Sequence, residues 1–388
     1  MSQRDVAIIG AGPAGLTAAR ILASAGHDVV VLEEHEQIGV PVHCTGVLGA
    51  AVFDEFDIPR DTILSTAHVA RFVAADGSDV AVDAENAKAA VVDRARFDQA
   101  LADAARTAGA VMRSGARVRT IQIDAAGATI GVDDGSAVRA RACVLACGAN
   151  YRFNRQLGLG SPRQYIQSAQ LEYPLAGPDS VEVHLGRDVA PGGFAWLVPF
   201  TRDGRMHTRV GLMCESRALH RFREFAARMR RRFGAAGASW PDPRLKILPL
   251  GPVSRTYADR LVAVGDAAGL VKPTTGGGIY YSLISGQLAG QTLDEALRAD
   301  DLRDTRLRRY EQEWRARLGA EIRIGLAFRT LASRMNDRAI DAVVELARVD
   351  GLIPLLRQTA DFNWHRQSAL ALLRHAQFRK ILLSSLWR

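Results

Sequence analysis

The pattern of hydrophobic and polar positions changes along the chain, and its first part predicts a parallel sheet. Residues 6–9 and 29–32 are short, uninterrupted apolar runs, which are typical of strands buried on both faces of such a sheet. Between them lies a helical stretch that ends at Gly26, a residue type common just after helix C-termini. A strand, a helix and a second strand in this order form a βαβ unit, so we expect an α/β fold.

A glycine-rich turn connects the first strand of this unit to its helix. Gly10, Gly12 and Gly15 have the G-x-G-x-x-G spacing of a dinucleotide-binding turn. The first glycine permits a tight turn, the second lets the backbone approach a pyrophosphate, and the third packs the helix on the strand. Glu33 follows the second strand and can accept hydrogen bonds from ribose hydroxyls. The unit therefore predicts a dinucleotide cofactor, and a nicotinamide or a flavin would each suit it.

A second glycine-rich stretch, residues 261–290, predicts backbone that faces a ligand. It combines a buried strand, a Gly-Asp turn, a loop with a proline, three consecutive glycines and a helix. Backbone N–H groups at such a helix start attract an anion. A loop with so few side chains also lets a flat ligand lie against the backbone. We hypothesise that the two glycine-rich stretches build one cofactor site.

The middle of the chain has a different hydrophobic period. From residue 161 to residue 213, apolar and polar residues alternate, which is typical of a half-buried antiparallel sheet. We expect the strand-like residues 67–73 and 79–82 to join this sheet. Residues 217–232 predict a helix with seven arginines. We interpret these arginines as a solvated face, and the alternative is a surface for anions.

The last part of the chain has a helical pattern throughout, from Asp294 onward. Its final segment, residues 362–388, contains five basic residues and no acidic one, mixed with large apolar residues. One interpretation, which we favour, is a helical layer packed on the domains with its basic residues outward. The other is an interfacial helix on an anionic membrane.

These changes of pattern divide the chain into three regions. The first region is discontinuous, because the second region is inserted into it. The predicted division is a Rossmann-type domain of residues 1–65, 83–155 and 245–295, an antiparallel-sheet domain of residues 66–82 and 156–244, and a C-terminal helical region of residues 296–388.

Composition and charge narrow the range of partners. Of the 388 residues, 48% are hydrophobic and 24% are charged, as in an ordinary globular protein. The net charge of +8 comes almost wholly from arginine, since only four residues are lysines, and no nucleic-acid-binding motif accompanies it. The four cysteines are too few and too scattered for a disulfide framework and lack the paired spacing of a zinc site. We expect neither a nucleic acid nor a metal ion as a ligand.

The sequence also predicts the compartment. The N-terminal residues lead directly into a strand and a glycine turn, which is not the pattern of a signal peptide. No apolar run approaches the roughly 20 residues that a membrane-spanning helix needs. We therefore expect a cytoplasmic protein, associated with a membrane surface if the basic C-terminal segment is interfacial.

Together, these motifs resemble a known family. The glycine turn with Glu33, the helix start at residues 92–98 and the Gly265-Asp266 turn resemble glutathione-reductase-type FAD proteins of the p-hydroxybenzoate hydroxylase-like branch. Three further motifs, residues 41–44, 191–199 and 265–279, are similar to the geranylgeranyl reductase family. The resemblance implies an FAD-dependent oxidoreductase that saturates C=C bonds of a polyprenyl lipid, a quinone tail or a pigment precursor.

The resemblance also implies roles for single residues. Asp266 would bind the ribityl or phosphate part of FAD, and the loop around Gly277 would line the isoalloxazine ring. Phe194 and Trp196 would form the aromatic wall of an apolar tunnel for the prenyl chain. The implied cofactor contacts are Gly10, Gly12, Pro13, Ala14, Gly15, Glu33, Glu34, Cys44, Arg94, Gly265, Asp266, Pro273, Gly276, Gly277, Gly278 and Ile279, and the implied substrate contacts are His43, Phe194 and Trp196.

Saturation of an isolated C=C bond also requires a proton donor. Flavin can deliver hydride to one carbon, but no carbonyl group polarises the bond, so a positioned acid must protonate the other carbon. The candidates near the predicted flavin are Cys44, His43, Tyr280 and Tyr281. We assign the catalytic role first to Cys44, which matches the family's cysteine, and second to Tyr280. The alternative for Cys44 is a small buried apolar residue.

Several functional alternatives remain at this point. Because the chain contains a single dinucleotide turn, the electrons must come from NAD(P)H that docks transiently, from ferredoxin or from another carrier. A flavin monooxygenase, a flavin-dependent halogenase and a flavoprotein that only carries lipid are the competing functions. The chain departs from the family at Cys147, Phe194 and Val198, where aspartate, tyrosine and phenylalanine are usual. Phe194 also disfavours a halogenase, which has tryptophan there.

Overall fold

The first sheet contains the parallel strands that the apolar runs predict, extended by antiparallel strands. The computed structural model describes residues 3–83, 89–235, 237, 240–349 and 352–386. In it, β1 (Arg4–Ile9) lies between β2 (Val29–Leu32) and β11 (Ala137–Leu145) and is parallel to both. The strand order is β17-β18-β11-β1-β2-β8, and β10 and β9 extend from β11. The remaining strands of this sheet are β8 (Val111–Arg113), β9 (Val118–Asp124), β10 (Gly127–Val132), β17 (Tyr257–Ala258) and β18 (Leu261–Ala263).

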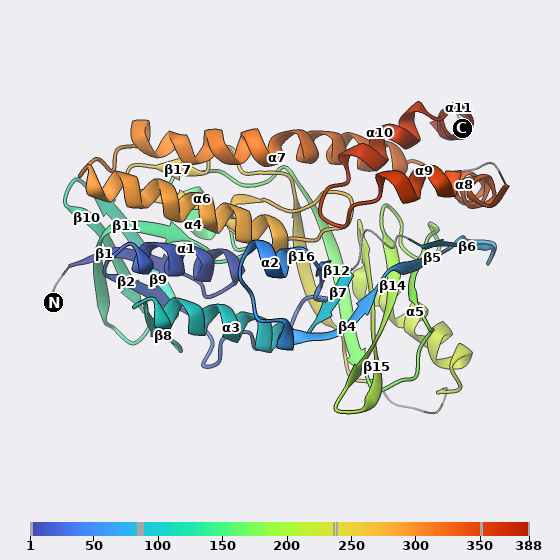
Figure 1. Cartoon of the computed structure of the whole chain (residues 1–388), viewed down its shortest axis with the longest axis horizontal. Coiled ribbons are helices and arrows are strands. Elements are labelled where there is room, and N and C mark those ends of the chain that lie inside the picture. The colour runs from blue at the N-terminus through green and yellow to red at the C-terminus, as the bar shows by residue number, and fades with distance from the viewer. Residues whose placement is uncertain (1–2, 84–88, 236, 238–239, 350–351, 387–388) are drawn as a thin grey trace.

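A layer of helices packs beside this sheet, and in it α1 (Pro13–Ser24) lies between two others (Figure 1). Its neighbours are α3 (Arg94–Thr107), which Asp93 caps through the N–H groups of its first turn, and α6 (Ile279–Arg298). An ideal Cβ at Gly286 of α6 would lie 2.3 Å from the carbonyl oxygen of Ala14. The absence of a side chain at Gly286 therefore sets how closely α6 approaches α1. The short helical elements are α2 (Val52–Glu55), η1 (Arg60–Thr62), α4 (Arg152–Gln156) and η2 (Gly265–Ala268).

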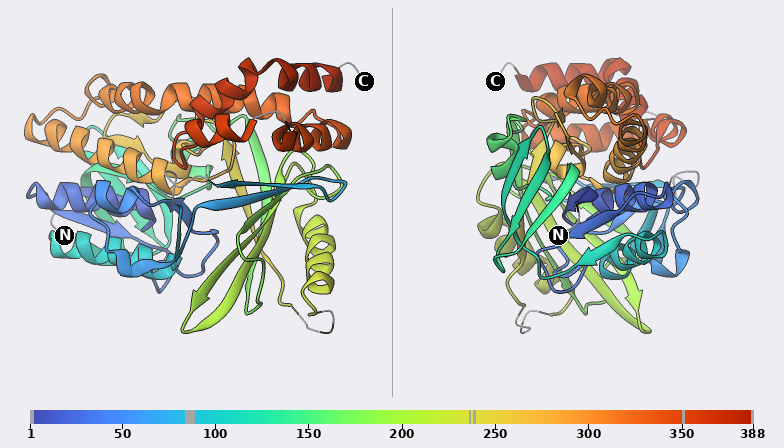
Figure 2. Two further views of the ribbon diagram at one scale, coloured as in Figure 1. Left: turned by 45° about the vertical axis from the view of Figure 1, so that its right-hand side comes forward. Right: turned by 90° about the vertical axis from the view of Figure 1, so that its left-hand side faces the viewer.

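The second sheet confirms the antiparallel middle of the chain and its two additional strands. Its order is β16-β12-β15-β14-β13-β5-β6. Figure 2 shows its long strands beside the first sheet, with α5 (Ala218–Arg232) packed against them. The strands are β5 (Val69–Val73), β6 (Asp79–Asp83), β12 (Gln164–Tyr173), β13 (Val181–His184), β14 (Phe194–Arg202), β15 (Arg205–Cys214) and β16 (Arg244–Leu250). A small third sheet has the order β3 (Val47–Gly49), β7 (Ala89–Val92), β4 (Ile63–Ala67).

Strand β16 corrects one expected domain boundary. We placed residues 245–250 in the Rossmann-type domain, but they pair with β12 in the second sheet. The pattern misled because Leu245 and Ile247 are exposed, at 53% and 55%, whereas Lys246 between them faces a cavity. This arrangement inverts the usual apolar-inward alternation of a strand. With this boundary moved to residue 251, the three regions remain our proposed division of the chain.

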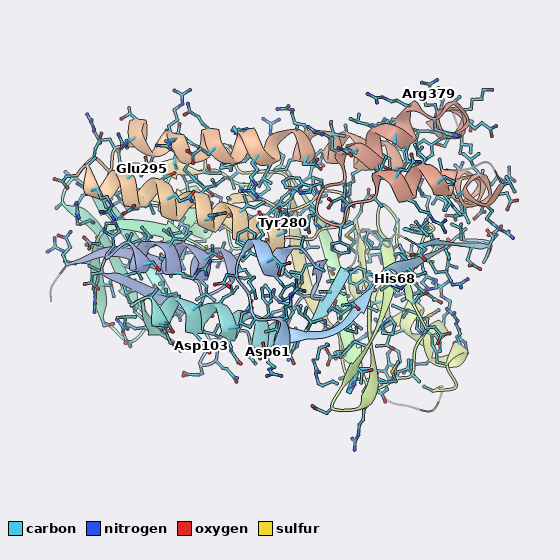
Figure 3. All side chains as sticks on the ribbon, viewed as in Figure 1. Asp61, His68, Asp103, Tyr280, Glu295 and Arg379 are labelled. Atoms are coloured by element: carbon cyan, nitrogen blue, oxygen red, sulfur yellow. The ribbon has the colours of Figure 1, made fainter. Side chains whose placement is uncertain are left out.

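The C-terminal region forms a helical layer along one side of both sheets (Figure 1). Phe378 and Leu382 are buried in one cluster with Val344, whereas Arg379 (labelled in Figure 3) and Lys380 are exposed. Trp387 and Arg388, part of the basic segment, lie outside the described residues. Within the part of the chain that the structure describes, no helix is both long and apolar enough to cross a membrane. The helices of this region are α7 (Asp304–Ala332), α8 (Asp337–Val349), α9 (Leu352–Thr359), α10 (Arg366–Arg374) and α11 (Ala376–Leu386).

The contact between α1 and α6 generates a test of the fold. In Gly286→Ala the new methyl group would collide with backbone, so we expect a loss of about 1–3 kcal/mol in the free energy of unfolding. The matched control is Gly319→Ala in α7, where an added Cβ meets its nearest atom at 3.8 Å. There, higher helix propensity should stabilise the protein by about 0.5–1 kcal/mol. Urea denaturation measures both values, and an equal effect of the two substitutions would contradict the packing described.

Candidate functional site

A cavity of about 1020 Å³ lies between the first and second sheets and has walls from both. Its size is at the upper end of the range for small-molecule and cofactor sites. The segments that contribute to its walls include the turn after β1, the end of β2, residues 39–48, the start of α3, residues 116–119 and 146–148, strands β5, β13, β14 and β16, residues 264–266 and 275–280, and the segment between α9 and α10. The two glycine-rich stretches thus line one cavity, as the sequence predicted.

The three glycines of the turn after β1 have different roles. Two of them permit close packing, and the third leaves open space. Gly10 has a φ of +105°, and a Cβ there would lie 2.4 Å from the carbonyl oxygen of Ala146. A Cβ at Gly15 would lie 2.2 Å from the carbonyl oxygen of Gly10, so this glycine permits the close contact of helix and turn. A Cβ at Gly12, in contrast, meets none of the described atoms within 4 Å. Gly12, Pro13 and Ala14 border the cavity, and Gly15 lies behind it.

The acidic residues after β2 also reach this cavity. The Glu33 carboxylate accepts hydrogen bonds from the backbone N–H of Ala11 at 2.8 Å and of His35 at 3.1 Å. These bonds fix its position at the carboxyl end of β2, beside the glycine turn. Glu34 forms an ion pair with Arg117, with 2.9 Å between Oε2 and Nε. Both glutamates border the cavity.

The second glycine-rich stretch brings the start of α6 against the start of α1. A Cβ at Gly265 would lie 3.0 Å from the Cβ of Ala14, and one at Gly278 would lie 2.7 Å from Oδ1 of Asp266. The N-cap residues of the two helices, Gly12 and Gly278, have no side chains. The N–H groups at both helix starts therefore face the cavity without a capping side chain, which favours an anionic ligand.

Pro273 corrects one expected cofactor contact. Its ring packs toward α7, with Cδ 3.2 Å from the position of a Cβ on Gly325. Its carbonyl oxygen accepts a hydrogen bond from Arg329 at 3.3 Å. Pro273 does not border the cavity, and its neighbours Lys272 and Thr275 do. The loop turns at this point, so the proline holds the C-terminal region instead of lining the ligand site.

Arg94 has the features of a ligand-binding residue. Its side chain is 10% exposed and forms an ion pair with Asp98 at 2.7 Å, yet its Nη1 is buried without a hydrogen-bond partner among the described residues. Burial disfavours the charged guanidinium, but the negative charge of Asp98 outweighs burial and raises the pKa of Arg94. A buried donor without a partner is costly. Arg94 borders the cavity, so a ligand can satisfy this donor.

Cys44 lies in the cavity wall near three cations. Its Sγ accepts a hydrogen bond from the N–H of Gly46 at 3.4 Å. Besides Arg94, the buried Arg209 and the partly exposed Lys246 interact electrostatically with Cys44. Arg209 donates to the carbonyl oxygen of Thr45 at 2.5 Å and to Glu172 at 3.0 Å. The residues around Gly46 are thus held against a cluster of positive charge.

Two lysines of the described residues, Lys246 and Lys272, border the cavity, and neither was predicted from the sequence as a site residue. Nζ of Lys246 lies 3.3 Å from Oδ2 of Asp266, and the charge of Asp266 raises the pKa of this lysine. Lys272 is 5% exposed and donates to the carbonyl oxygen of Phe362 at 2.7 Å. The scarcity of lysine in an arginine-rich chain was the available signal. No pattern indicated which way either side chain points.

The expected substrate contacts lie in the wall that the second sheet supplies. The rings of Phe194 and Trp196 are 5.8 Å apart on β14, and both border the cavity together with His43. Burial and the nearby charges of Lys246 and Arg244 lower the pKa of His43. Apolar side chains continue this wall away from the glycine turn. They are Val69, Phe72, Val181, Val183, Leu185 and Val198.

Tyr280 corrects one of the two expected catalytic residues. Tyr280, labelled in Figure 3, borders the cavity, and its ring packs 5.5 Å from the ring of Trp364. Its hydroxyl group, however, donates to Oε2 of Glu55 at 2.9 Å. Burial and this hydrogen bond raise the pKa of Tyr280 to about 12. The hydroxyl proton is therefore held by Glu55 and is not available to a ligand. Tyr281, another candidate, is buried outside the cavity wall.

Comparisons with known proteins place these features in context. A family model described as lycopene cyclase protein matches residues 5–339. Digeranylgeranylglycerophospholipid reductases 1 and 2 of Methanopyrus kandleri are 33% and 31% identical to this chain, and each alignment covers 91% of it and 96% and 92% of the relative. A geranylgeranyl bacteriochlorophyll reductase-like protein from Thermoplasma acidophilum shares the fold, with a TM-score of 0.84 and 23% identity over 99% of this chain and 100% of that one.

The buried pair of Arg94 and Asp98 generates a test of the site's electrostatics. At pH 7, above the pKa of about 6 to which burial raises Asp98, Asp98→Ala would leave a buried guanidinium without its counter-charge. We expect a loss of about 3–5 kcal/mol in the free energy of unfolding. The control is Asp103→Ala on the same helix (Figure 3), whose carboxylate is 70% exposed beside Arg106. It should cost at most about 1 kcal/mol. Equal losses in urea denaturation would contradict a buried, ligand-facing pair.

Proposed function

The chain belongs to the geranylgeranyl reductase family, and from this premise we propose that it uses FAD to reduce C=C bonds of a polyprenyl lipid. One observation supports this function most strongly: a single cavity combines a backbone-lined dinucleotide cradle with an aromatic and aliphatic wall. A dinucleotide needs N–H donors and positive charge around its phosphates. A prenyl chain needs an apolar surface that removes it from water. The two kinds of wall meet in this cavity.

The dinucleotide cradle is the part of the cavity lined by the glycine turn, Glu33 and Arg94. Three of its features fit FAD. Gly12 leaves space where a pyrophosphate would bind, and the uncapped starts of α1 and α6 favour its charge. Glu33 is fixed where an adenosine ribose would bind. Arg94 offers a buried donor without a protein partner. Bound FAD would supply the hydride for the reduction.

The apolar wall suits the positive charge that develops on the substrate during the reduction. Reduction of an isolated double bond develops positive charge on carbon, because no carbonyl group delocalises the electrons. The faces of Phe194 and Trp196 can stabilise such charge through their ring quadrupoles. The neighbouring aliphatic side chains exclude water and so prevent its addition to that carbon.

Cys44 is our proposed proton donor. After it protonates the substrate, negative charge remains on the sulfur, and Arg94, Arg209 and Lys246 are the cations that would stabilise this charge. His43 is a weaker candidate, since its lowered pKa leaves it uncharged at pH 7. We therefore assign His43 to the substrate wall.

Two external partners complete the proposal. The reduction consumes electrons that NAD(P)H or ferredoxin must supply, because the chain has one dinucleotide turn. The lipid substrate must also reach the protein from a membrane. Exposed Arg379 and Lys380, together with Leu383, which is 54% exposed, give α11 basic and apolar groups suited to a peripheral contact with anionic lipid.

Anaerobic half-reactions test the function. We expect the purified protein to bind FAD, and we expect its dithionite-reduced form to be reoxidised by digeranylgeranylglycerophospholipid while the lipid gains hydrogen atoms. The matched control is the fully saturated lipid, which should leave the flavin reduced. Absorbance follows the flavin, and mass spectrometry follows the lipid. Failure of every prenyl lipid to reoxidise the flavin would exclude this function. Incorporation of oxygen or halide into the lipid in air would favour the hydroxylase or the halogenase instead.

The role of Cys44 is tested in the same half-reaction. Removal of a general acid typically slows its step by about 10²–10⁴-fold, so Cys44→Ala should slow reoxidation by prenyl lipid to this extent while FAD binding persists. The control is Cys147→Ala, which removes the other cysteine of the cavity wall, at the glycine-turn end. It should retain the wild-type rate within a few-fold. A wild-type rate in Cys44→Ala would show that another group supplies the proton.

A further inference from the structure

Lys272 is a buried charge for which the mechanism above has no role. Its side chain is 5% exposed, borders the cavity and donates to the carbonyl oxygen of Phe362 at 2.7 Å. Its Nζ also lies 4.7 Å from the centre of the Phe362 ring. Removing an ammonium group from water is costly, and one neutral acceptor and one ring compensate only in part. This cost suggests that the charge serves a ligand.

The ammonium group lies next to the glycines at the start of α6. The N–H of Lys272 donates to the carbonyl oxygen of Gly277 at 3.1 Å, and the N–H of Gly276 donates to that of Lys272 at 2.8 Å. A Cβ at Gly277 would lie 3.0 Å from Cε and 3.6 Å from Nζ of Lys272. The lysine thus packs against a segment that has no side chains of its own. The positive end of the α6 dipole begins at the next residue, Gly278.

No described carboxylate neutralises this charge by contact. Glu321 and Asp361 interact with Lys272 electrostatically, but neither lies within ion-pair distance of its Nζ in the described part of the chain. An oxygen of Glu321 accepts from the N–H groups of His365 and Arg366, and one of Asp361 accepts from those of residues 363 and 364. Lys246, in contrast, is paired with Asp266 at 3.3 Å.

The ammonium group of Lys272 keeps its positive charge near neutral pH, and its neighbour His365 is uncharged. Burial and the charge of Lys272 lower the pKa of His365 to about 3, so the imidazole is uncharged near neutral pH. Burial lowers the pKa of Lys272 itself to about 8, and the ammonium form therefore predominates at pH 7. The hydrogen bond to Phe362, in the segment between α9 and α10, fixes the position of this ammonium group.

We propose that Lys272 is a positioning residue that raises the reduction potential of bound FAD through its positive charge beside Gly277. A two-electron-reduced flavin is commonly anionic, and a fixed cation beside the ring stabilises that anion relative to the neutral oxidised ring. The lysine would act together with the dipole of α6. The consequence is easier loading of the enzyme by a weak external reductant. This inference rests on the FAD site proposed above.

Equilibrium redox titration of the FAD-loaded protein at pH 7, against a reference dye and without substrate, tests this inference. Lys272→Met removes the charge at similar length. Lys272→Gln also removes it but keeps a donor for the Phe362 carbonyl. In both variants we expect the ratio of reduced to oxidised FAD at a fixed potential to fall about tenfold, which is about 30 mV for a two-electron couple. Lys272→Arg should stay within threefold of wild type, and Arg308→Met on the exposed face of α7 should have no effect.

The possible results separate this inference from the function on which it rests. Wild-type potentials in both Lys272→Met and Lys272→Gln, with FAD bound, would overturn the role of Lys272 and leave the reductase proposal intact. An equal fall in the ratio of reduced to oxidised FAD in Lys272→Arg would also overturn the role of Lys272. The shape of the side chain, and not its charge, would then be responsible. If the wild-type protein binds no FAD, the reductase proposal and this inference both fail. Circular dichroism confirms that each variant is folded before titration.

Discussion

The structure depends on the close contact of α1 with α6 and with the Gly265 turn. A Cβ at Gly286 of α6 would lie 2.3 Å from the carbonyl oxygen of Ala14 in α1, and one at Gly265 would lie 2.8 Å from Oγ of Ser282. The N-terminal ends of α1 and α6 both border the cavity. Close packing thus leaves Gly265 without a side chain at the cavity wall. A wall of this kind offers N–H groups and helix dipoles but no full charges.

The charged side chains at the cavity come from other parts of the chain. Some of these cations form ion pairs with carboxylates of the described residues, and Lys272 does not. Arg94 is paired with Asp98 and Lys246 with Asp266. Lys272 donates to the carbonyl oxygen of Phe362 and has no carboxylate in contact among the described residues. A dinucleotide cradle, a cluster of cations around Cys44 and an apolar wall follow one another along a single cavity. This order suits a reaction that joins an anionic cofactor to an uncharged lipid.

The sequence predicted the framework of the fold better than the directions of its side chains. The apolar runs near Gly10 predicted the first sheet, because strands that are buried on both faces of a parallel sheet are apolar along nearly their whole length. Strand β16 was missed because its inward residue is Lys246 and its outward ones are apolar. The glycines of the site followed from their spacing. The orientations of Pro273 and Tyr280 did not, because they depend on Gly325 and Glu55, far away along the chain.

The central claim is that one cavity holds both the flavin and the prenyl chain. A crystal structure of the protein with FAD and a non-reducible, saturated prenyl lipid tests it most directly. We predict the pyrophosphate at Gly12, the flavin ring beside Gly277, and the lipid chain along Phe194 and Trp196, with Cys44 beside a position of the chain where the unsaturated substrate has a C=C bond. FAD bound outside this cavity, or a lipid chain that lies elsewhere while FAD occupies it, would contradict the account.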